Sequence, residues 1–256
     1  MKKTTCLLAA IGLLFCLLAA PTGAAPAYNR ALALRIRGDV DGNGTVTTTD
    51  ARMILQYAAG KSMPDTFDRT AADYEYNGRA DTTDARLTLQ YAAGKQETLP
   101  RPMPTEVGWF GEKKIDGESV PCVIGETIPN NMLRYFSLEY NAYNSDPTDV
   151  FAAQTPEEWA ILKALAGFTV DYDEAFFADW MLVVASVYLG STNSTYTAEG
   201  LIRGNGVLQV IGTCHHPSPD DQSVARGYAV IEVSRQETEG VTALSIHEES
   251  VTDFHW

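Results

Sequence analysis

Several features are scarce or absent in this sequence. It has four cysteines, and 19 lysines and arginines against 33 acids, so no cationic surplus is available to bind nucleic acid or an anionic membrane. Beyond the N-terminus no apolar run is long enough to span a membrane. Gly-x-Ser-x-Gly, His-Glu-x-x-His and phosphate-loop motifs are absent. The excess of acids therefore disfavours nucleic-acid binding and is compatible with cation binding. The missing motifs disfavour the hydrolase and nucleotide-binding functions that depend on them.

Residues 1–27 have the pattern of a secretory signal peptide. Two lysines precede an apolar run from Cys6 to Ala20, and small residues follow it. This run of about 15 residues is shorter than the roughly 20 that a spanning helix needs, which favours a cleaved signal over a membrane anchor. Cleavage after Ala24 or after Ala27 fits equally well. We therefore expect a secreted, extracellular protein with no membrane span in the mature chain.

Cleavage of this segment removes two of the four cysteines and leaves Cys122 and Cys214. A disulfide between them is compatible with an oxidising location. Their spacing alone leaves both the paired and the free state open.

An internal repeat with an offset of 34 residues is the most informative feature of the sequence. Residues 39–52 align with residues 73–86, and the string Leu-Gln-Tyr-Ala-Ala-Gly-Lys follows in both copies. Each copy places oxygen-bearing residues along twelve positions, with glycine at the sixth, where the turn requires positive φ. Ca²⁺ prefers six to eight oxygen ligands, which such a loop supplies. The repeat therefore predicts two calcium ions, one in each loop.

The predicted ligands occupy equivalent positions in the two loops. They are Asp39, Asp41, Asn43, Thr45, Thr47 and Asp50 in the first loop, and Asp73, Glu75, Asn77, Arg79 (through its carbonyl), Asp81 and Asp84 in the second.

A loop followed by a helix, present twice, with aspartate at position 12 and Ala-Arg after it, resembles a type I dockerin. An ordinary EF-hand instead has a helix before the loop and a glutamate at position 12. The resemblance covers about residues 36–95. It implies a small all-α module of two calcium-loop and helix repeats, which binds a cohesin on a scaffold protein in a cellulosome-like assembly for polysaccharide degradation. Glu75 replaces the family's Asp or Asn, so full occupancy of the second site stays open.

The resemblance also implies a partner-binding surface. In dockerins, loop positions 10 and 11 and their neighbours on the same helix face contact cohesin. In this sequence these residues are Thr48, Thr49 and Arg52 in the first copy and Thr82, Thr83 and Arg86 in the second. Because the copies agree, the surface would be nearly two-fold symmetric and would allow two docking orientations. The alternative is that the threonines only cap helices, a common role for threonine.

Two short helices are expected at 48–59 and 82–93. Gly60 and Gly94 follow them as C-terminal stop residues. In the first helix Met53, Leu55 and Ala58 are apolar.

Prolines at positions 100, 102 and 104 predict a stiff, extended linker. The expected organisation is therefore a signal peptide at 1–27, a dockerin at 28–95, a proline-rich linker at 96–106 and a cargo domain of unknown function at 107–256. We expect the cargo domain to fold independently.

The cargo sequence predicts an α+β fold. Thr155 begins a helix, with Pro156 at its first position and Glu158 placed for a capping box, and Gly167 ends it. A second short helix follows Asp173. Expected strands lie at 120–124, 132–140, 180–188, 195–202, 207–214, 225–233 and 241–246. A tight turn joins the strands on either side of 203–206. The pattern predicts one antiparallel sheet that ends in a meander, with one or two helices against it.

This stretch also resembles, more weakly, an uncharacterised module of secreted Firmicutes proteins. The similarity lies in Glu157-Glu158-Trp159, in residues 172–177 and in residues 231–233. That family implies no activity.

Two classes of function remain open for the cargo. Its acids at 171–179 could supply the paired carboxylates of a glycosidase, and residues 214–216 (Cys-His-His) could form a metal or nucleophile site. Acids around a short helix are more commonly caps and solvated charges. We therefore expect no catalytic residues, and a domain that binds polysaccharide or protein. Candidate aromatic contacts are Trp109, Tyr140, Tyr143 and Trp256. The alternative is a small hydrolase delivered to plant cell-wall polysaccharide.

Overall fold

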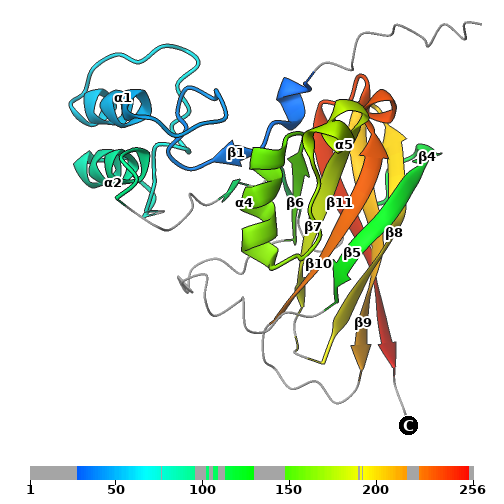
Figure 1. Cartoon of the computed structure of the whole chain (residues 1–256). Helices are drawn as coiled ribbons and strands as arrows, with labels where there is room; N and C mark the ends of the chain where they lie inside the picture. The colour runs from blue at the N-terminus through cyan, green and yellow to red at the C-terminus, as the bar shows by residue number, and fades with distance from the viewer. Residues whose placement is uncertain are drawn as a thin grey trace, which may run out of the picture.

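In the computed structural model of the whole chain, the described residues are 28–75, 77–95, 102–103, 106–108, 113–129, 148–189, 191, 193–217 and 225–253. The predicted signal peptide and the predicted strand at 132–140 lie outside them. Figure 1 shows a pair of short helices beside a larger β-sandwich that carries two helices on one face. Helices together with two largely antiparallel sheets agree with the predicted α+β class. Among the described residues, no helix is long and apolar enough to cross a membrane.

The helix pair consists of α1 (Thr48–Ala58) and α2 (Thr82–Ala92), close to the predicted ranges. Each helix begins with a capping box and ends before a glycine of positive φ, Gly60 at 75° and Gly94 at 66°. The amide of each glycine and that of the following lysine return to carbonyls in the last turn, a Schellman motif. Local sequence therefore determines both ends of each helix.

Each of the two helices buries one face in a shared core. In α1 the buried apolar residues are Ala51 and Ile54, whereas Leu55 is 50% exposed and its counterpart Leu89 in α2 is 47% exposed. Leu55 lies at the surface because α1 turns positions 51 and 54 toward the core. That core contains Val40, Ile54, Phe67, Ala71, Ala72, Ala85 and Met103.

The sandwich consists of two sheets. The five-stranded sheet has the order β3 (Glu106–Gly108), β6 (Thr148–Ala153), β7 (Trp180–Leu189), β10 (Ala225–Ser234) and β5 (Cys122–Ile128). The four-stranded sheet has the order β11 (Ala243–Asp253), β9 (Val207–Pro217), β8 (Thr195–Gly204) and β4 (Glu118–Val120). The predicted tight turn between β8 and β9 is present, with φ of 52° at Asn205 and 77° at Gly206.

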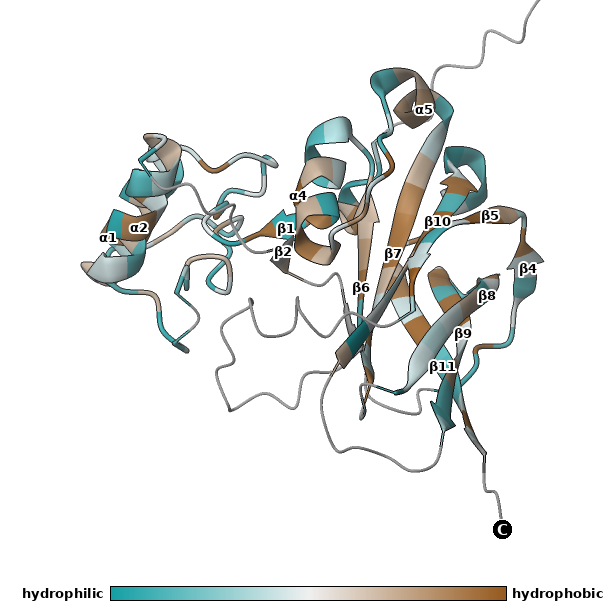
Figure 2. Cartoon of the chain, turned by 60° about the horizontal axis from the view of Figure 1, so that its bottom comes forward, coloured by the Kyte–Doolittle hydropathy of each residue, from teal (hydrophilic) through white to brown (hydrophobic). Residues whose placement is uncertain are grey.

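The prediction of one antiparallel sheet ending in a meander is wrong. After β9 the chain crosses to the other sheet as β10, passes through a 3₁₀ turn, η2 (Arg235–Thr238), and returns as β11, which pairs with β9 in parallel. β7 and β10 are buried on both faces, so hydrophobic alternation does not show which face meets the second sheet. Figure 2 shows this as hydrophobic colouring along β7. The predicted strand at 120–124 is split at Pro121, where the chain changes sheets.

Two helices cover the outer face of the five-stranded sheet. α4 (Pro156–Ala166) begins at Thr155 and ends before Gly167, as predicted, and α5 (Glu174–Asp179) follows. One apolar cluster fills the space between the sheets, and a second lies under these helices around Trp159.

The N-terminal segment connects the two parts. It forms η1 (Arg30–Leu32) and β1 (Arg35–Ile36), and β1 pairs antiparallel with β2 (Pro102–Met103) of the predicted linker. Met103 is buried in the core of the helix pair, whereas Leu32 is buried in the core between the sheets. Residues 28–36, which the predicted organisation placed with the docking module, therefore pack on the sandwich, and Figure 1 shows β1 between the helix pair and α4.

Candidate metal centre and docking surface

The first loop is organised around Asp39, at its first position. Asp39 is buried, with only 5% of its surface exposed. One carboxylate oxygen accepts hydrogen bonds from the amides of Gly42 (3.0 Å) and Asn43 (3.1 Å), and the other accepts from the amide of Gly44 (2.8 Å). The loop backbone therefore wraps around this carboxylate.

Asp50 closes the same loop from the first turn of α1 and is fully buried. Its Oδ1 accepts from the Val40 amide at 3.0 Å, and its Oδ2 accepts from the amide and the hydroxyl of Thr47, each at 2.8 Å. Position 12 thus has two roles: it ties the two ends of the loop together, and it completes the helix capping box.

Three acids of each loop bring oxygen atoms close together. Carboxylate oxygens of Asp39, Asp41 and Asp50 all lie within 4.8 Å of one another, and so do those of Glu75, Asp81 and Asp84. The chemistry of the donors fits a calcium ion, since hard oxygen ligands around a tight loop are what Ca²⁺ requires.

The second loop repeats this arrangement with a difference. Asp73 accepts from the amides of Asn77 (2.9 Å) and Gly78 (2.8 Å), as Asp39 does in the first loop. Glu75 is exposed, and one of its carboxylate oxygens accepts a hydrogen bond from the Asn77 side-chain amide. Its longer side chain therefore still reaches the acidic cluster but bonds a neighbouring predicted ligand.

Electrostatics also favour a cation. Burial raises the pKa of Asp39 to about 6, with Asp50 and Asp41 adding repulsion against the amide bonds that lower it. The hydrogen-bond donors recorded for Asp39 and Asp50 are amides and a hydroxyl, all neutral. A bound calcium ion would supply the missing positive charge. The identity of each individual ligand stays a prediction.

The predicted docking residues lie mostly at the surface. Thr48, Thr49 and Arg52 are exposed, as are Thr82 and Arg86, whereas Thr83 is half-buried. The helix caps are formed by Thr47 and Asp81 instead. The alternative that the four threonines only serve as caps is therefore wrong.

Two exposed leucines of the same helices, Leu55 and Leu89, were not among the predicted docking residues. They lie one turn beyond Arg52 and Arg86 and are about half exposed. Helical spacing puts the residues of each repeat on one face. We call Thr48, Arg52 and Leu55 the first stripe, and Thr82, Arg86 and Leu89 the second stripe. The signal was present in the sequence, because both leucines open the string shared by the two repeats.

Two of the acids at 171–179 have structural partners. Asp173 caps α5 by accepting from the Phe176 amide at 2.9 Å, and Asp171 forms an ion pair with Lys163. Glu158 does not complete the predicted capping box: its carboxylate accepts from the Gln154 amide at 2.6 Å and from the N-terminal segment.

The Cys-His-His sequence does not converge on one point. Cys214 is buried, with its thiol 3.3 Å from Glu248, whereas His216 Nδ1 lies 2.8 Å from the Ser194 hydroxyl. Cys122 and Cys214 are both free thiols.

The candidate aromatic contacts Trp109, Tyr140, Tyr143 and Trp256 lie outside the described residues. Within the described part, Trp180 is 36% exposed, and its ring stacks on Phe176 with centroids 6.3 Å apart.

Comparison with known proteins gives one match. Residues 37–91 match the family model of the dockerin type I domain, which confirms the resemblance for that segment. Neither the curated proteins nor the solved structures include a match to the chain. The weaker resemblance of the C-terminal stretch stays a prediction.

Proposed function

With a dockerin type I domain at residues 37–91 as the premise, we propose that this chain is a secreted component that docks, in calcium, to a cohesin on a scaffold protein. The observation that carries the proposal is the doubled site. Two loops each gather three acids, at positions 1, 3 and 12 in the first and at positions 3, 9 and 12 in the second, and each loop precedes a helix with the same exposed stripe. A cellulosome-like assembly for polysaccharide degradation is the setting that this family implies.

Calcium would organise the surface without touching the partner. Each loop ends in an aspartate that is also the third residue of its helix, so an ion held by the loop fixes the start of α1 or α2. The stripes begin at this same turn, with Thr48 and Thr82. Loss of calcium is therefore expected to disorder the docking face.

The test is a calorimetric titration of the full chain with purified type I cohesins from the producing organism. We expect one or more cohesins to bind in millimolar calcium and none to bind after chelation. Binding that is unchanged in excess chelator would count against a calcium-organised surface. Failure of every cohesin to bind in calcium would remove the docking proposal.

For the cargo we propose a non-catalytic binding role. Asp171 and Asp173 have an ion pair and a helix cap as partners, which supports a structural use of these acids. The exposed, stacked Trp180 offers an apolar ring to a ligand. Incubation with cellulose, xylan, mannan and pectin tests this proposal: retention without release of reducing sugar supports it, and sugar release that is lost in Asp173→Ala would support the small-hydrolase alternative.

A further inference from the structure

Residues 28–36 precede the docking module but contribute to the interior of the sandwich. Leu32 is fully buried in the cluster between the two sheets. Leu34 and Ile36, 3% and 4% exposed, belong to the cluster under α4. Three large apolar side chains of this segment therefore lose their surface to the sandwich, a stabilising contribution of the same kind as that of its own strands.

Buried polar groups hold the same segment in place. The Glu158 carboxylate, on α4, accepts from the Tyr28 hydroxyl at 2.5 Å and from the Leu34 amide at 3.1 Å. Asn29 exchanges backbone hydrogen bonds with the Gln154 side chain, at 2.7 and 2.9 Å, and its own side chain donates to the Val241 carbonyl at 2.9 Å. Unpaired burial of these groups would be costly, so the segment completes the sandwich.

The first calcium loop begins three residues after this segment. The Asp39 amide donates to the Ile36 carbonyl at 3.2 Å, and Val46, inside the loop, packs against the cluster that contains Leu34 and Ile36. Tyr28 and Asp39 line one cavity of about 510 Å³. The first loop is thus in contact with the sandwich through its own residues and through its entry strand.

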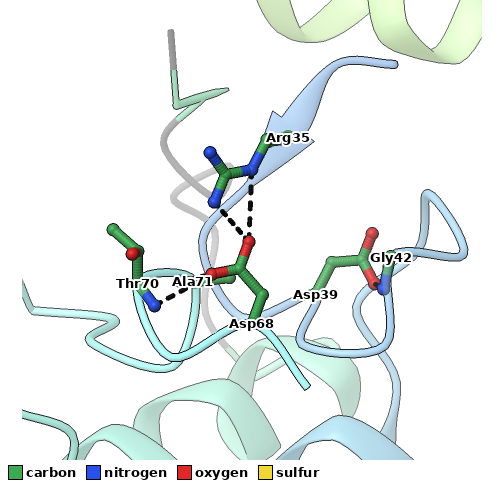
Figure 3. A network of polar contacts seen from close by, with 6 residues as sticks. All are labelled: Arg35, Asp39, Gly42, Asp68, Thr70 and Ala71. Atoms are coloured by element: carbon green, nitrogen blue, oxygen red, sulfur yellow. Dashed lines mark hydrogen bonds and ion pairs between the residues drawn. The ribbon is translucent and has the colours of Figure 1, made fainter. Parts of the chain in front are cut away.

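An ion pair links β1 to the segment between the two repeats. In Figure 3 the Arg35 guanidinium reaches Asp68, whose other oxygen accepts from the amides of Thr70 (2.9 Å) and Ala71 (3.1 Å). The Gly38 amide donates to the Ala71 carbonyl at 2.8 Å. β1 therefore connects both to the loop at Asp39 and to the segment between the repeats.

We propose that the first calcium loop and the sandwich form one coupled folding unit, in which calcium bound at Asp39 stabilises the sandwich through residues 28–39. The second loop reaches the same segment through the Asp73 carbonyl, which accepts a hydrogen bond from Arg37 at 2.8 Å, but none of its described residues packs in an apolar cluster of the sandwich, so its ion acts mainly on the helix pair. This proposal rests on the calcium binding of the proposed function. It adds that the stability of the cargo depends on whether the first loop holds calcium.

Tryptophan fluorescence separates the two parts. All four tryptophans, at 109, 159, 180 and 256, follow the docking module in the sequence, so their signal during thermal unfolding reports on the cargo. In the full chain we expect saturating calcium to raise the tryptophan-detected midpoint by about 5 °C or more relative to chelator.

The matched variants are Asp39→Asn and Asp73→Asn, which change the first position of each loop. Asp39→Asn is expected to abolish the calcium-induced shift, and Asp73→Asn to preserve most of it. Calcium binding is measured by calorimetry on the same samples. Bound calcium with no shift in the wild-type midpoint, or equal losses in the two variants, overturns the coupling and leaves the docking proposal intact. Absence of bound calcium in the wild type overturns both.

Discussion

At the scale of single residues, the acids of the two loops differ at position 3, where Asp41 in the first corresponds to Glu75 in the second, and at position 9, where Thr47 corresponds to Asp81. The glutamate reaches the acidic cluster but engages Asn77 with one oxygen. Calcium affinity depends on how many ligands a loop can present without rearrangement. Side-chain length at position 3 should therefore affect the calcium affinity of each loop.

Exchange of these side chains tests that dependence. Glu75→Asp is expected to tighten the weaker of two calcium sites by about tenfold, or about 1.4 kcal/mol. The mirror-image variant Asp41→Glu should weaken the tighter site by a similar factor. Calorimetric calcium titrations of both variants check this. If both sites gained calcium affinity, or both lost it, after these opposite changes, the dependence of affinity on side-chain length at position 3 would be contradicted.

A residue-scale prediction also follows for the interior of the sandwich. Tyr196 is fully buried, and its hydroxyl has no hydrogen-bond partner among the described residues. Removal of an unpaired buried hydroxyl should stabilise a protein, because the cost of leaving it without water disappears. Tyr196→Phe is therefore expected to raise the free energy of unfolding by about 1 kcal/mol.

Close packing around Tyr196 predicts a second substitution, which should destabilise the protein. A β-carbon on Gly227 would lie 2.5 Å from the Tyr196 β-carbon, so Gly227→Ala should lower the stability by roughly 1–3 kcal/mol. Urea unfolding followed by tryptophan fluorescence measures both variants. A destabilised Tyr196→Phe protein would show that the hydroxyl has a partner after all.

Some residue assignments follow from sequence and others do not. The loop acids could be predicted because coordination of a hard cation determines their type and spacing. Glu158 could not, because its position fits a local capping box equally well, whereas its actual donors include the amide of Leu34, 124 residues away in sequence. Local patterns do not record such long-range partners.

At the scale of elements, α1 and α2 present matching stripes, and burial of α1 against the core leaves the first stripe in solvent. Exposed leucines at equivalent positions of both helices indicate a binding surface more strongly than scattered apolar residues do, because the duplication places the same side chain on both helices. The elements therefore predict a partner that either helix can engage.

Charge placed on the leucines tests this redundancy. Leu55→Asp alone, or Leu89→Asp alone, should change cohesin affinity only a few-fold, because the other stripe can bind after a half-turn. The double variant should lose about 2 kcal/mol or more of binding free energy, as expected for buried apolar contacts at an interface. Ser62→Asp, at an exposed position between the helices, is the control. If either single variant abolishes binding in calorimetry, one helix dominates and the symmetric model is wrong.

Element boundaries were easier to predict than element pairing. The ends of α4 follow from Thr155, Pro156 and Gly167, which act within one turn of the chain. The parallel pairing of β11 with β9 depends on a crossover through the other sheet, and strand alternation contains no information about it. Predictions of helix ends therefore succeeded where those about sheet topology failed.

At the scale of the whole molecule, the chain combines a dockerin type I segment with a sandwich that uses residues from both sides of that segment. β1 and β2 run side by side between the two parts, so the entry and the exit of the module are held together. The sequence suggested a simple order of module, linker and cargo, because the alternation of Leu32, Leu34 and Ile36 does not show which part of the chain buries them.

This architecture predicts that residues 107–256 alone are less stable than the same residues in the full chain. Without Leu32, Leu34 and Ile36 both apolar clusters lose side chains, which should cost at least about 2 kcal/mol. Urea unfolding of the fragment, with and without a synthetic peptide of residues 28–37, measures the loss and its rescue. Equal midpoints for the fragment and the full chain would support an independent cargo domain.

Native mass spectrometry of the full chain mixed with a cohesin tests the central claim most directly, because it counts partners and ions in one spectrum. The account predicts a one-to-one complex that carries two more calcium ions than the cohesin alone and that dissociates after chelation. A complex that persists without the added ions, or a chain that carries calcium and forms no complex with any cohesin of its organism, would contradict it.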